Sequence, residues 1–158
     1  VLETILRYEY LWTKIRIQGG AYGATARFDS NGLGIFASYR DPKLAESFQA
    51  YYDLPAWLEK EEFSARELDK YVIGTISGMD TPLTNTMRLD TVTTSWLKNI
   101  TDEHRQKSRN EVLDVTNEDL QALAPVIRDM LSDGYVCVVG GKQPIEANAE
   151  RFNKIINA

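Results

Sequence analysis

The stretch that decides the fold runs from residue 11 to residue 23 and reads Leu11-Trp12-Thr13-Lys14-Ile15-Arg16-Ile17-Gln18-Gly19-Gly20-Ala21-Tyr22-Gly23. Its first part continues a segment, from about Glu3 to Ile17, that is rich in long apolar side chains and has neither glycine nor proline. This composition predicts a largely buried helix. Gly19-Gly20 ends the helix, because glycine readily takes the left-handed conformation past a helix end.

Beyond this turn the period changes from that of a helix to that of a strand. Ala24, Ala26 and Phe28 alternate with polar residues, which suits a strand with one buried face. Ser30-Asn31-Gly32 follows, and Asn-Gly is a strong hairpin signal. Residues 33–39 are then the return strand. The sequence therefore predicts an antiparallel hairpin over residues 23–39.

Start and stop residues predict helices along most of the remaining chain. Asp41-Pro42 opens a helix that we expect to continue to about Glu61, with a kink or break at Pro55. Further helices are expected to begin at Ser64, where Ser64-Ala65-Arg66-Glu67 is a capping box, and at Asp80, Thr101, Thr116 and Pro144. The Thr116 helix is expected to continue through Leu131 and to end at Gly134.

The short run Tyr135–Val139 is wholly apolar, which predicts a strand covered on both faces and a buried, structural Cys137. Hairpin, helices and one late strand together predict an α+β fold: a largely antiparallel sheet with helices packed on one face. Residues 1–158 are expected to form a single domain. Because three strands make a thin sheet, we expect the domain's first strand to lie upstream of Val1.

Composition excludes several classes of function. The net charge of −5 and the sequence pI near 5.0 argue against a nucleic-acid surface, which needs clustered Lys and Arg. No apolar run approaches the roughly 18 residues that cross a bilayer, and Val1-Leu2-Glu3-Thr4 does not resemble a signal peptide. The single Cys137 indicates a reducing compartment. We expect the cytoplasm, or an organelle matrix in a eukaryote.

Metal and nucleophile chemistry find little support in the chain. A catalytic zinc needs about three protein ligands, whereas His104 and Cys137 are the only histidine and cysteine. His104 belongs to the polar start of a helix and is expected to be a solvated surface residue. No serine lies in a nucleophile turn, and Gly140-Gly141-Lys142 lacks the other residues of a phosphate-binding loop. We therefore expect no metal site in this chain.

Arg16 and Tyr22 are the residues with the clearest chemical potential. The Gly-Gly turn can bring them close together, and the small residues around it leave room for the backbone of a ligand. A guanidinium and a phenol are both donors that can bind the carbonyl oxygens of an extended peptide, and a phenol can stabilise an oxyanion. Scaffold roles also explain both residues, since arginine is favourable at a helix C-terminus and a tyrosine after glycine is an ordinary residue at the start of a strand. Residue chemistry alone favours that scaffold interpretation.

A family resemblance changes this balance. The string Arg16-x-x-Gly19-Gly20-Ala21-Tyr22-Gly23 resembles the C-terminal half of pitrilysin/insulinase-family metallopeptidases, particularly the presequence protease branch. Nearly the whole chain resembles that branch in order, through the strings Tyr10-Leu11-Trp12, Phe28-Asp29-Ser30, Ser38-Tyr39-Arg40-Asp41-Pro42, Asp69-Lys70-Tyr71-Val72-Ile73-Gly74-Thr75, Met79-Asp80-Thr81-Pro82 and Val136-Cys137-Val138-Val139-Gly140.

The resemblance implies a division of labour between two halves that close around a substrate chamber. The N-terminal half of such enzymes holds zinc through an inverted H-x-x-E-H motif and a distant Glu, and the C-terminal half contributes an Arg and a Tyr. By motif matching, Arg16 would grip the peptide backbone and Tyr22 would bond the scissile carbonyl as it becomes an oxyanion. Residues 1–158 would be the last domain of a zinc endopeptidase that degrades short unstructured peptides.

The chain departs from the family pattern in one respect, because it contains no H-x-x-E-H. The zinc-bearing half would then belong to the N-terminal portion of the same polypeptide, and this fragment alone would be inactive. Two alternatives remain: a noncatalytic interaction or core subunit of the same superfamily, and a free-standing peptide-binding domain that uses the hairpin edge. The Arg16–Tyr22 pair favours the enzyme, since a subunit that never touches substrate has no chemical need for both.

Overall fold

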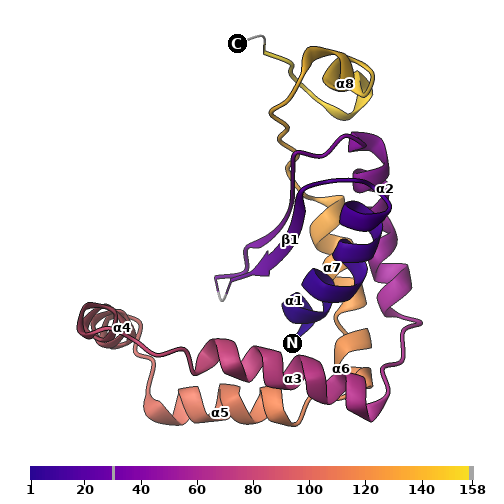
Figure 1. The fold of residues 1–158 in the computed structure, drawn as a ribbon. Helices are drawn as coiled ribbons and strands as arrows, with labels where there is room; N and C mark the ends of the chain where they lie inside the picture. The colour runs from indigo at the N-terminus through magenta and orange to yellow at the C-terminus, as the bar shows by residue number, and fades with distance from the viewer. Residues whose placement is uncertain (30, 157–158) are drawn as a thin grey trace.

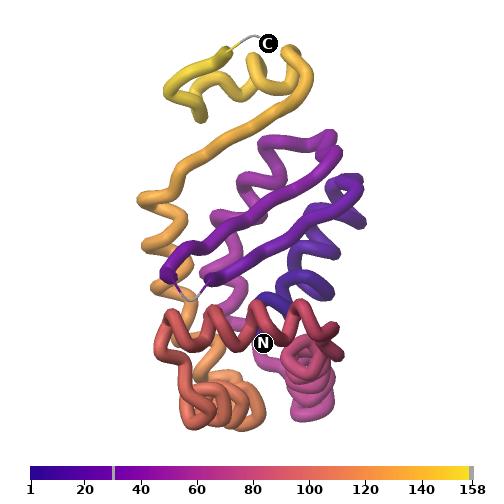
Figure 2. The backbone as a smooth tube through the Cα atoms, turned by 90° about the vertical axis from the view of Figure 1, so that its left-hand side faces the viewer, coloured from indigo at the N-terminus to yellow at the C-terminus, as the bar shows by residue number. Residues whose placement is uncertain are grey.

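The computed structural model describes residues 1–29 and 31–156 and has the predicted α+β class. Its sheet consists of β1 (Gly23–Phe28) and β2 (Gly34–Tyr39), paired antiparallel. The N-terminal helix, α2 and α7 stand against one face of this hairpin (Figures 1 and 2). The helices are α1 (Leu2–Ile5), α2 (Leu44–Leu58), α3 (Ala65–Met79), α4 (Asn85–Leu97), α5 (Asp102–Leu113), α6 (Asn117–Gln121), α7 (Ala124–Ser132) and α8 (Lys142–Glu146), followed by a 3-10 turn at Ala149–Arg151.

The predicted N-terminal helix is confirmed, with a geometry that the sequence did not indicate. After α1 the helix continues through two π-helical segments, Leu6–Tyr10 and Trp12–Ile17. It is buried because its long apolar side chains face the hairpin and α2, and Ile5, Leu6, Leu11 and Ile15 are fully buried. None of the helices among the described residues is long and apolar enough to cross a membrane.

The predicted hairpin is also confirmed. Ala26, which is 1% exposed, lies opposite Phe36, so both side chains point to the core face, where the Phe36 ring stacks on Tyr51 at 5.3 Å. Of the predicted turn, Ser30 lies outside the described residues. The Asn31 side chain accepts a hydrogen bond from the Leu33 N–H at 3.0 Å, and Gly32 takes a positive φ of 86°. Local turn chemistry thus fixes the reversal.

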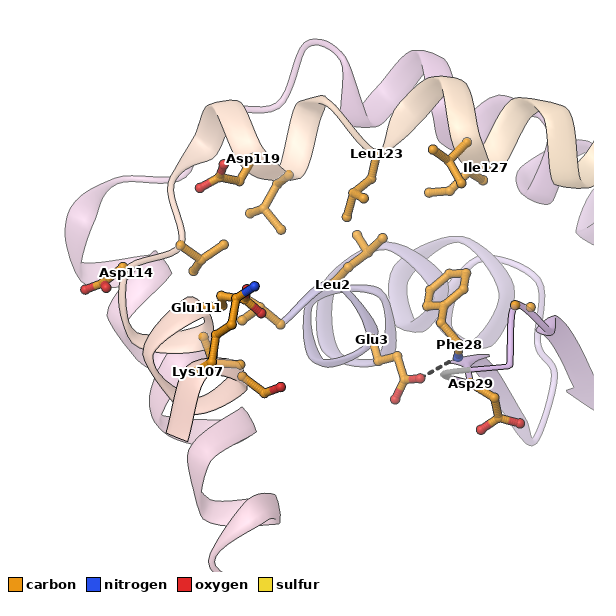
Figure 3. A pocket seen from close by; sticks show the side chains of 18 of the residues that line it. Leu2, Glu3, Phe28, Asp29, Lys107, Glu111, Asp114, Asp119, Leu123 and Ile127 are labelled. Carbon is orange, nitrogen blue, oxygen red and sulfur yellow. Dashed lines mark hydrogen bonds and ion pairs between the residues drawn. The ribbon is translucent and has the colours of Figure 1, made fainter. Parts of the chain in front are cut away.

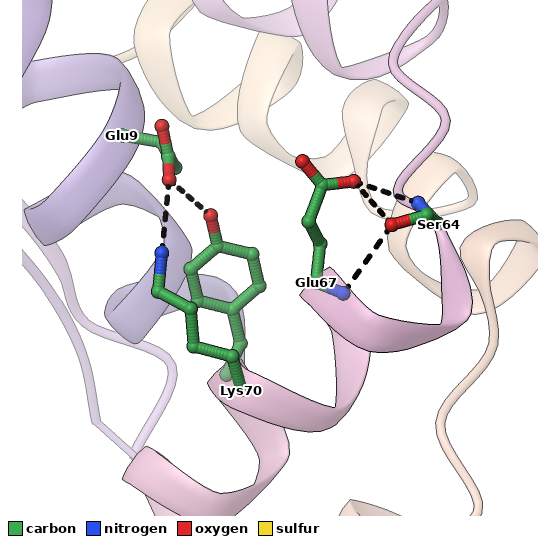
Figure 4. Close-up of polar contacts among 5 residues, drawn as sticks. Glu9, Ser64, Glu67 and Lys70 are labelled. Carbon is green, nitrogen blue, oxygen red and sulfur yellow. Dashed lines mark hydrogen bonds and ion pairs between the residues drawn. The ribbon is translucent and has the colours of Figure 1, made fainter.

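Glu9 ties helix α3 to the N-terminal helix (Figure 4). The buried Tyr71 hydroxyl donates to the Glu9 carboxylate, and Lys70 Nζ lies 3.3 Å from the same group. Burial, and then the bond to Glu9, raise the pKa of Tyr71, so this hydroxyl keeps its proton and remains a donor. At the start of α3, Ser64 and Glu67 form the predicted capping box, with bonds of 3.4 and 2.9 Å.

Other helix boundaries confirm some predictions and correct others. Thr101 and Thr116 cap α5 and α6 as expected. The helix expected to begin at Asp80 instead begins after Thr84, whose hydroxyl accepts from a backbone N–H. Pro55 does not break α2, which continues to Leu58 and so ends before the expected Glu61.

The long helix expected from Thr116 to Leu131 is wrong, because the structure divides it into α6 and α7 around Leu123. Pro125 explains the break. A proline lacks the N–H that would donate to the Gln121 carbonyl, and its ring crowds the preceding turn. Pro125 instead occupies the first turn of α7, where no such donor is needed.

The strand expected at Tyr135–Val139 is not formed, and the prediction of a buried Cys137 is wrong. This segment has no ladder partner within the described part of the chain, and Cys137 is exposed. Tyr135 and Val139 are 105% and 97% exposed. Figure 2 shows the segment leading from α7 past the hairpin to α8. An apolar run favours burial, but a strand also needs a neighbouring edge that pairs with its backbone. The final helix contains Pro144 at its third position rather than its first.

The turn between the N-terminal helix and β1 generates the first prediction. A Cβ on Gly19 would lie 2.3 Å from the Ile15 carbonyl oxygen, a backbone atom that cannot move aside. We expect Gly19→Ala to lower the free energy of unfolding by about 1–3 kcal/mol, the usual cost of overpacking. Urea denaturation measures this. The control is Gly78→Ala in α3, where an added Cβ meets nothing within 4 Å and the helix should gain up to about 1 kcal/mol. Equal effects of the two substitutions would contradict the packing argument.

Candidate functional site

The Gly-Gly turn presents Arg16 and Tyr22 to solvent from its two sides. Arg16 lies in the last turn of the N-terminal helix, and Tyr22, which is 66% exposed, immediately precedes β1. The Gly20 N–H donates to the Arg16 carbonyl at 3.0 Å, and the Ala21 N–H donates to the Ile15 carbonyl at 3.1 Å. The backbone on both sides of the turn is therefore fixed, and the two predicted donors extend from a rigid base.

Trp12 supports the Arg16 guanidinium. The Arg16 Cζ lies 4.0 Å from the centroid of the Trp12 ring, one helical turn earlier in the sequence. Within the described residues, no carboxylate forms an ion pair with Arg16. Cation–π stacking holds the planar group without using its N–H donors. Those donors can therefore bond to an incoming ligand.

Tyr22 belongs to an aromatic and cationic cluster at the open end of the hairpin. Its ring meets Tyr39 edge to face, with centroids 5.9 Å apart and an interplanar angle of 85°. The Arg40 Cζ lies 5.9 Å from the Tyr22 centroid and 5.5 Å from that of Tyr39. In the sequence, Tyr39 and Arg40 are distinguished only as part of the string Ser38-Tyr39-Arg40-Asp41-Pro42. The predicted hairpin offered a signal for them, since its pairing places Tyr39 opposite Gly23, next to Tyr22.

The small residues around the turn have different physical roles. Gly19 is required by its close approach to Ile15, and Gly20 by its positive φ of 83°. Ala21 is 4% exposed and belongs to the core. Gly23 borders open space, because an added Cβ would meet nothing within 4 Å. Room for the backbone of a ligand beside Tyr22 therefore lies at Gly23.

Metal-binding groups do not gather in the described ranges 1–29 and 31–156, where no three His, Cys, Asp or Glu side chains are placed to share an ion. His104 lies in the exposed first turn of α5, where its backbone N–H donates to the Thr101 hydroxyl at 3.2 Å. Cys137 is exposed in the segment before α8. His104 and Cys137 therefore do not form a metal site together.

A large cavity lies away from Arg16 and Tyr22, beneath the N-terminal end of α1 (Figure 3). Its volume is about 1420 Å³, and it is bounded by α1, the hairpin turn and α5 to α7. Its apolar floor includes Leu2, Phe28, Leu123 and Ile127, and carboxylates such as Asp114 stand at its edge. No local sequence pattern could have revealed it, because segments far apart in the chain build it.

Comparison with known proteins identifies the family. Residues 1–142 match the family model described as the PreP C-terminal domain. The chain belongs to this family. It is 38% identical over 155 residues to Protein HypA of Clostridium perfringens, and 32% identical over 155 residues to presequence protease 1, chloroplastic/mitochondrial, of Arabidopsis thaliana. It is also 34% identical over 147 residues to the mitochondrial presequence protease of Emericella nidulans. The predicted resemblance to presequence proteases is thereby confirmed.

These alignments cover 98%, 97% and 90% of this chain, but 16%, 14% and 13% of the three relatives. The chain thus spans about one sixth or less of the length of the curated relatives that it matches. As a PreP C-terminal domain, it corresponds to the C-terminal part of presequence proteases.

Proposed function

We propose that this chain is the last domain of a zinc-dependent endopeptidase that degrades short, unstructured peptides, and that it holds the substrate. The observation that carries the proposal is the paired exposure of Arg16 and Tyr22 on one rigid turn, in a chain of the PreP C-terminal domain family. Buried positions would have supported the scaffold interpretation. Exposed donors on a fixed backbone instead suit a partner from outside the domain.

The two donors would act on different parts of the substrate. Arg16, steadied by Trp12, would bond carbonyl oxygens of an extended peptide backbone through its free N–H groups. Tyr22 would donate its phenolic hydrogen to the scissile carbonyl oxygen. That bond strengthens as the oxygen gains negative charge in the transition state, so it would accelerate the reaction rather than merely bind substrate.

Zinc would be held outside this chain, since the described residues offer no group of side chains that could bind it. Its chemistry would be that of a metallopeptidase: activation of water and polarisation of the carbonyl. The partners would be the peptide substrate and the N-terminal, zinc-bearing half of the same polypeptide. We propose the cytoplasm for the whole protein. If its source is eukaryotic we propose an organelle matrix instead, because two of the relatives carry mitochondrial or chloroplastic names.

The purified 158-residue chain should cleave no unstructured peptide, with or without added zinc, because residues 1–29 and 31–156 offer donors but no group of side chains that could bind a metal ion. Hydrolysis of a fluorogenic peptide measures this, with the full-length protein as the positive control. Zinc-dependent turnover that co-purifies with the folded chain would show that the division of labour is wrong.

In the full-length protein, Tyr22→Phe should lower kcat by about 10²–10³, because one oxyanion donor is lost, while KM changes little. The matched control is Tyr52→Phe, which removes a hydroxyl from another exposed tyrosine, in α2. Steady-state kinetics with one peptide measures kcat and KM for both variants. An unchanged kcat would show that Tyr22 is a structural residue and not an oxyanion donor.

Arg16→Ala should raise KM about 10-fold or more, because the peptide backbone loses charge-assisted hydrogen bonds of the kind worth about 1.5–3 kcal/mol each. Arg7→Ala removes another exposed guanidinium from the same helix and should leave the kinetics unaltered. Direct peptide binding to an inactivated full-length protein provides a second readout. Equal effects of the two substitutions would show that Arg16 contributes only its positive charge and makes no specific contact with the peptide backbone.

A further inference from the structure

Arg40 and Tyr22 lie at the same open end of the hairpin. The last ladder pair joins Gly23 and Tyr39, and the Tyr22 N–H donates to the Tyr39 carbonyl at 3.0 Å. Tyr22 and Arg40 are the residues that adjoin this last pair, one on each strand. The hairpin therefore brings them to the same end of the sheet.

The backbone of Arg40 has an unusual conformation. Its φ is 49°, in the left-handed region, and Arg40 and Asn99 are the two residues other than glycine with positive φ in the part of the chain that the structure describes. A side chain with a Cβ is disfavoured there, and arginine has no local hydrogen bond that would compensate as asparagine has. Such conformations persist where surrounding structure enforces them, and they gather at functional sites.

The segment after Arg40 is attached to the Gly-Gly turn, and this attachment enforces the conformation. The Asp41 carboxylate accepts from the Lys43 N–H at 2.9 Å, and Lys43 Nζ donates to the Gln18 carbonyl at 3.1 Å. Pro42 packs against Gly20, where a Cβ would lie 3.6 Å from the Pro42 Cγ. The turn that bears Arg16 and Tyr22 and the corner that bears Arg40 thus form one unit.

The side chain of Arg40 is directed back over the hairpin end. Its guanidinium lies 5.9 Å from the Tyr22 ring centroid and 5.5 Å from that of Tyr39, and the two rings meet at 85°. Tyr22 is exposed, so its ring would otherwise be free to turn about its side-chain bonds. Contact with Tyr39 on one side and a cation nearby restricts that motion.

We propose that Arg40 is a positioning residue, which together with Tyr39 holds the Tyr22 phenol in the orientation that meets the scissile carbonyl. This inference rests on the proposed function of Tyr22. Arg40 itself contacts the ring and not the reacting atoms. Arg40 would preorganise the Tyr22 hydroxyl, because an oxyanion donor is effective only if it already points to the place where charge develops.

The test compares Arg40→Gly, Arg40→Lys and Asn99→Gly in the full-length protein. Glycine adopts the left-handed conformation without strain, so Arg40→Gly removes the guanidinium and keeps the backbone. Asn99→Gly makes the matched change at the other left-handed position, after α4. We expect Arg40→Gly to lower kcat about 10- to 100-fold with little change in KM, the scale on which misplaced groups act. Arg40→Lys should recover much of the loss, and Asn99→Gly should have no effect.

A double-mutant cycle separates this inference from the proposed function. On a Tyr22→Phe background, Arg40→Gly should cause no further loss of kcat, because there is no longer a hydroxyl to position. A full additional loss on that background would overturn the positioning role, as would an effect confined to KM, which would mark Arg40 as a peptide contact. If Tyr22→Phe alone has no effect, the proposed function fails first, whatever Arg40→Gly does.

Discussion

The close approach of Gly19 to the Ile15 carbonyl is the constraint on which the rest of the structure depends. A helix that is buried along one side must be followed by a chain that turns back at once, or the hairpin could not cover it. No side chain fits between Gly19 and the preceding helical turn. Gly20 completes the reversal with its positive φ, and β1 then runs back along the N-terminal helix. Two adjacent glycines thus determine where helix and sheet meet.

On each side of this turn, a buried core residue is followed directly by an exposed candidate functional residue. Ile15 and Ala21 point inward and are 0% and 4% exposed, whereas Arg16 and Tyr22 point outward. Core residues must match one another in volume, but outward residues on a rigid base are free to serve a partner. Because the outward pair contributes little to the core, its chemistry can change without loss of the fold. A preorganised donor site needs this separation of roles.

Under the proposed function, metal chemistry and substrate alignment occupy different parts of one large protein. The chain covers 13–16% of the three relatives compared, and within the described residues the groups that could act on a peptide are donors and not metal ligands. Such a division lets the substrate close the site, since the catalytic constellation is complete only when both parts meet around the peptide.

The sequence by itself determined the elements that depend on near neighbours. The buried N-terminal helix, the Gly-Gly turn, the Asn31-Gly32 hairpin and the Ser64–Glu67 capping box follow from contacts within a few residues, so local patterns predicted them. Arg16 and Tyr22 could be named because their string is specific to a family. Their chemistry alone favoured scaffold roles.

The tertiary structure decided what depends on a distant partner. The apolar run at Tyr135–Val139 forms no strand because burial preference does not supply a pairing edge. The cavity beneath α1 forms because the hairpin turn and α5 to α7 converge there. Arg40 lies near the Tyr22 ring because the hairpin pairing ends beside both residues and because the Arg40 backbone is left-handed. Sequence patterns indicate the preferences of single segments. These features instead depend on contacts between segments that are distant in the sequence, and such contacts form only in the folded chain.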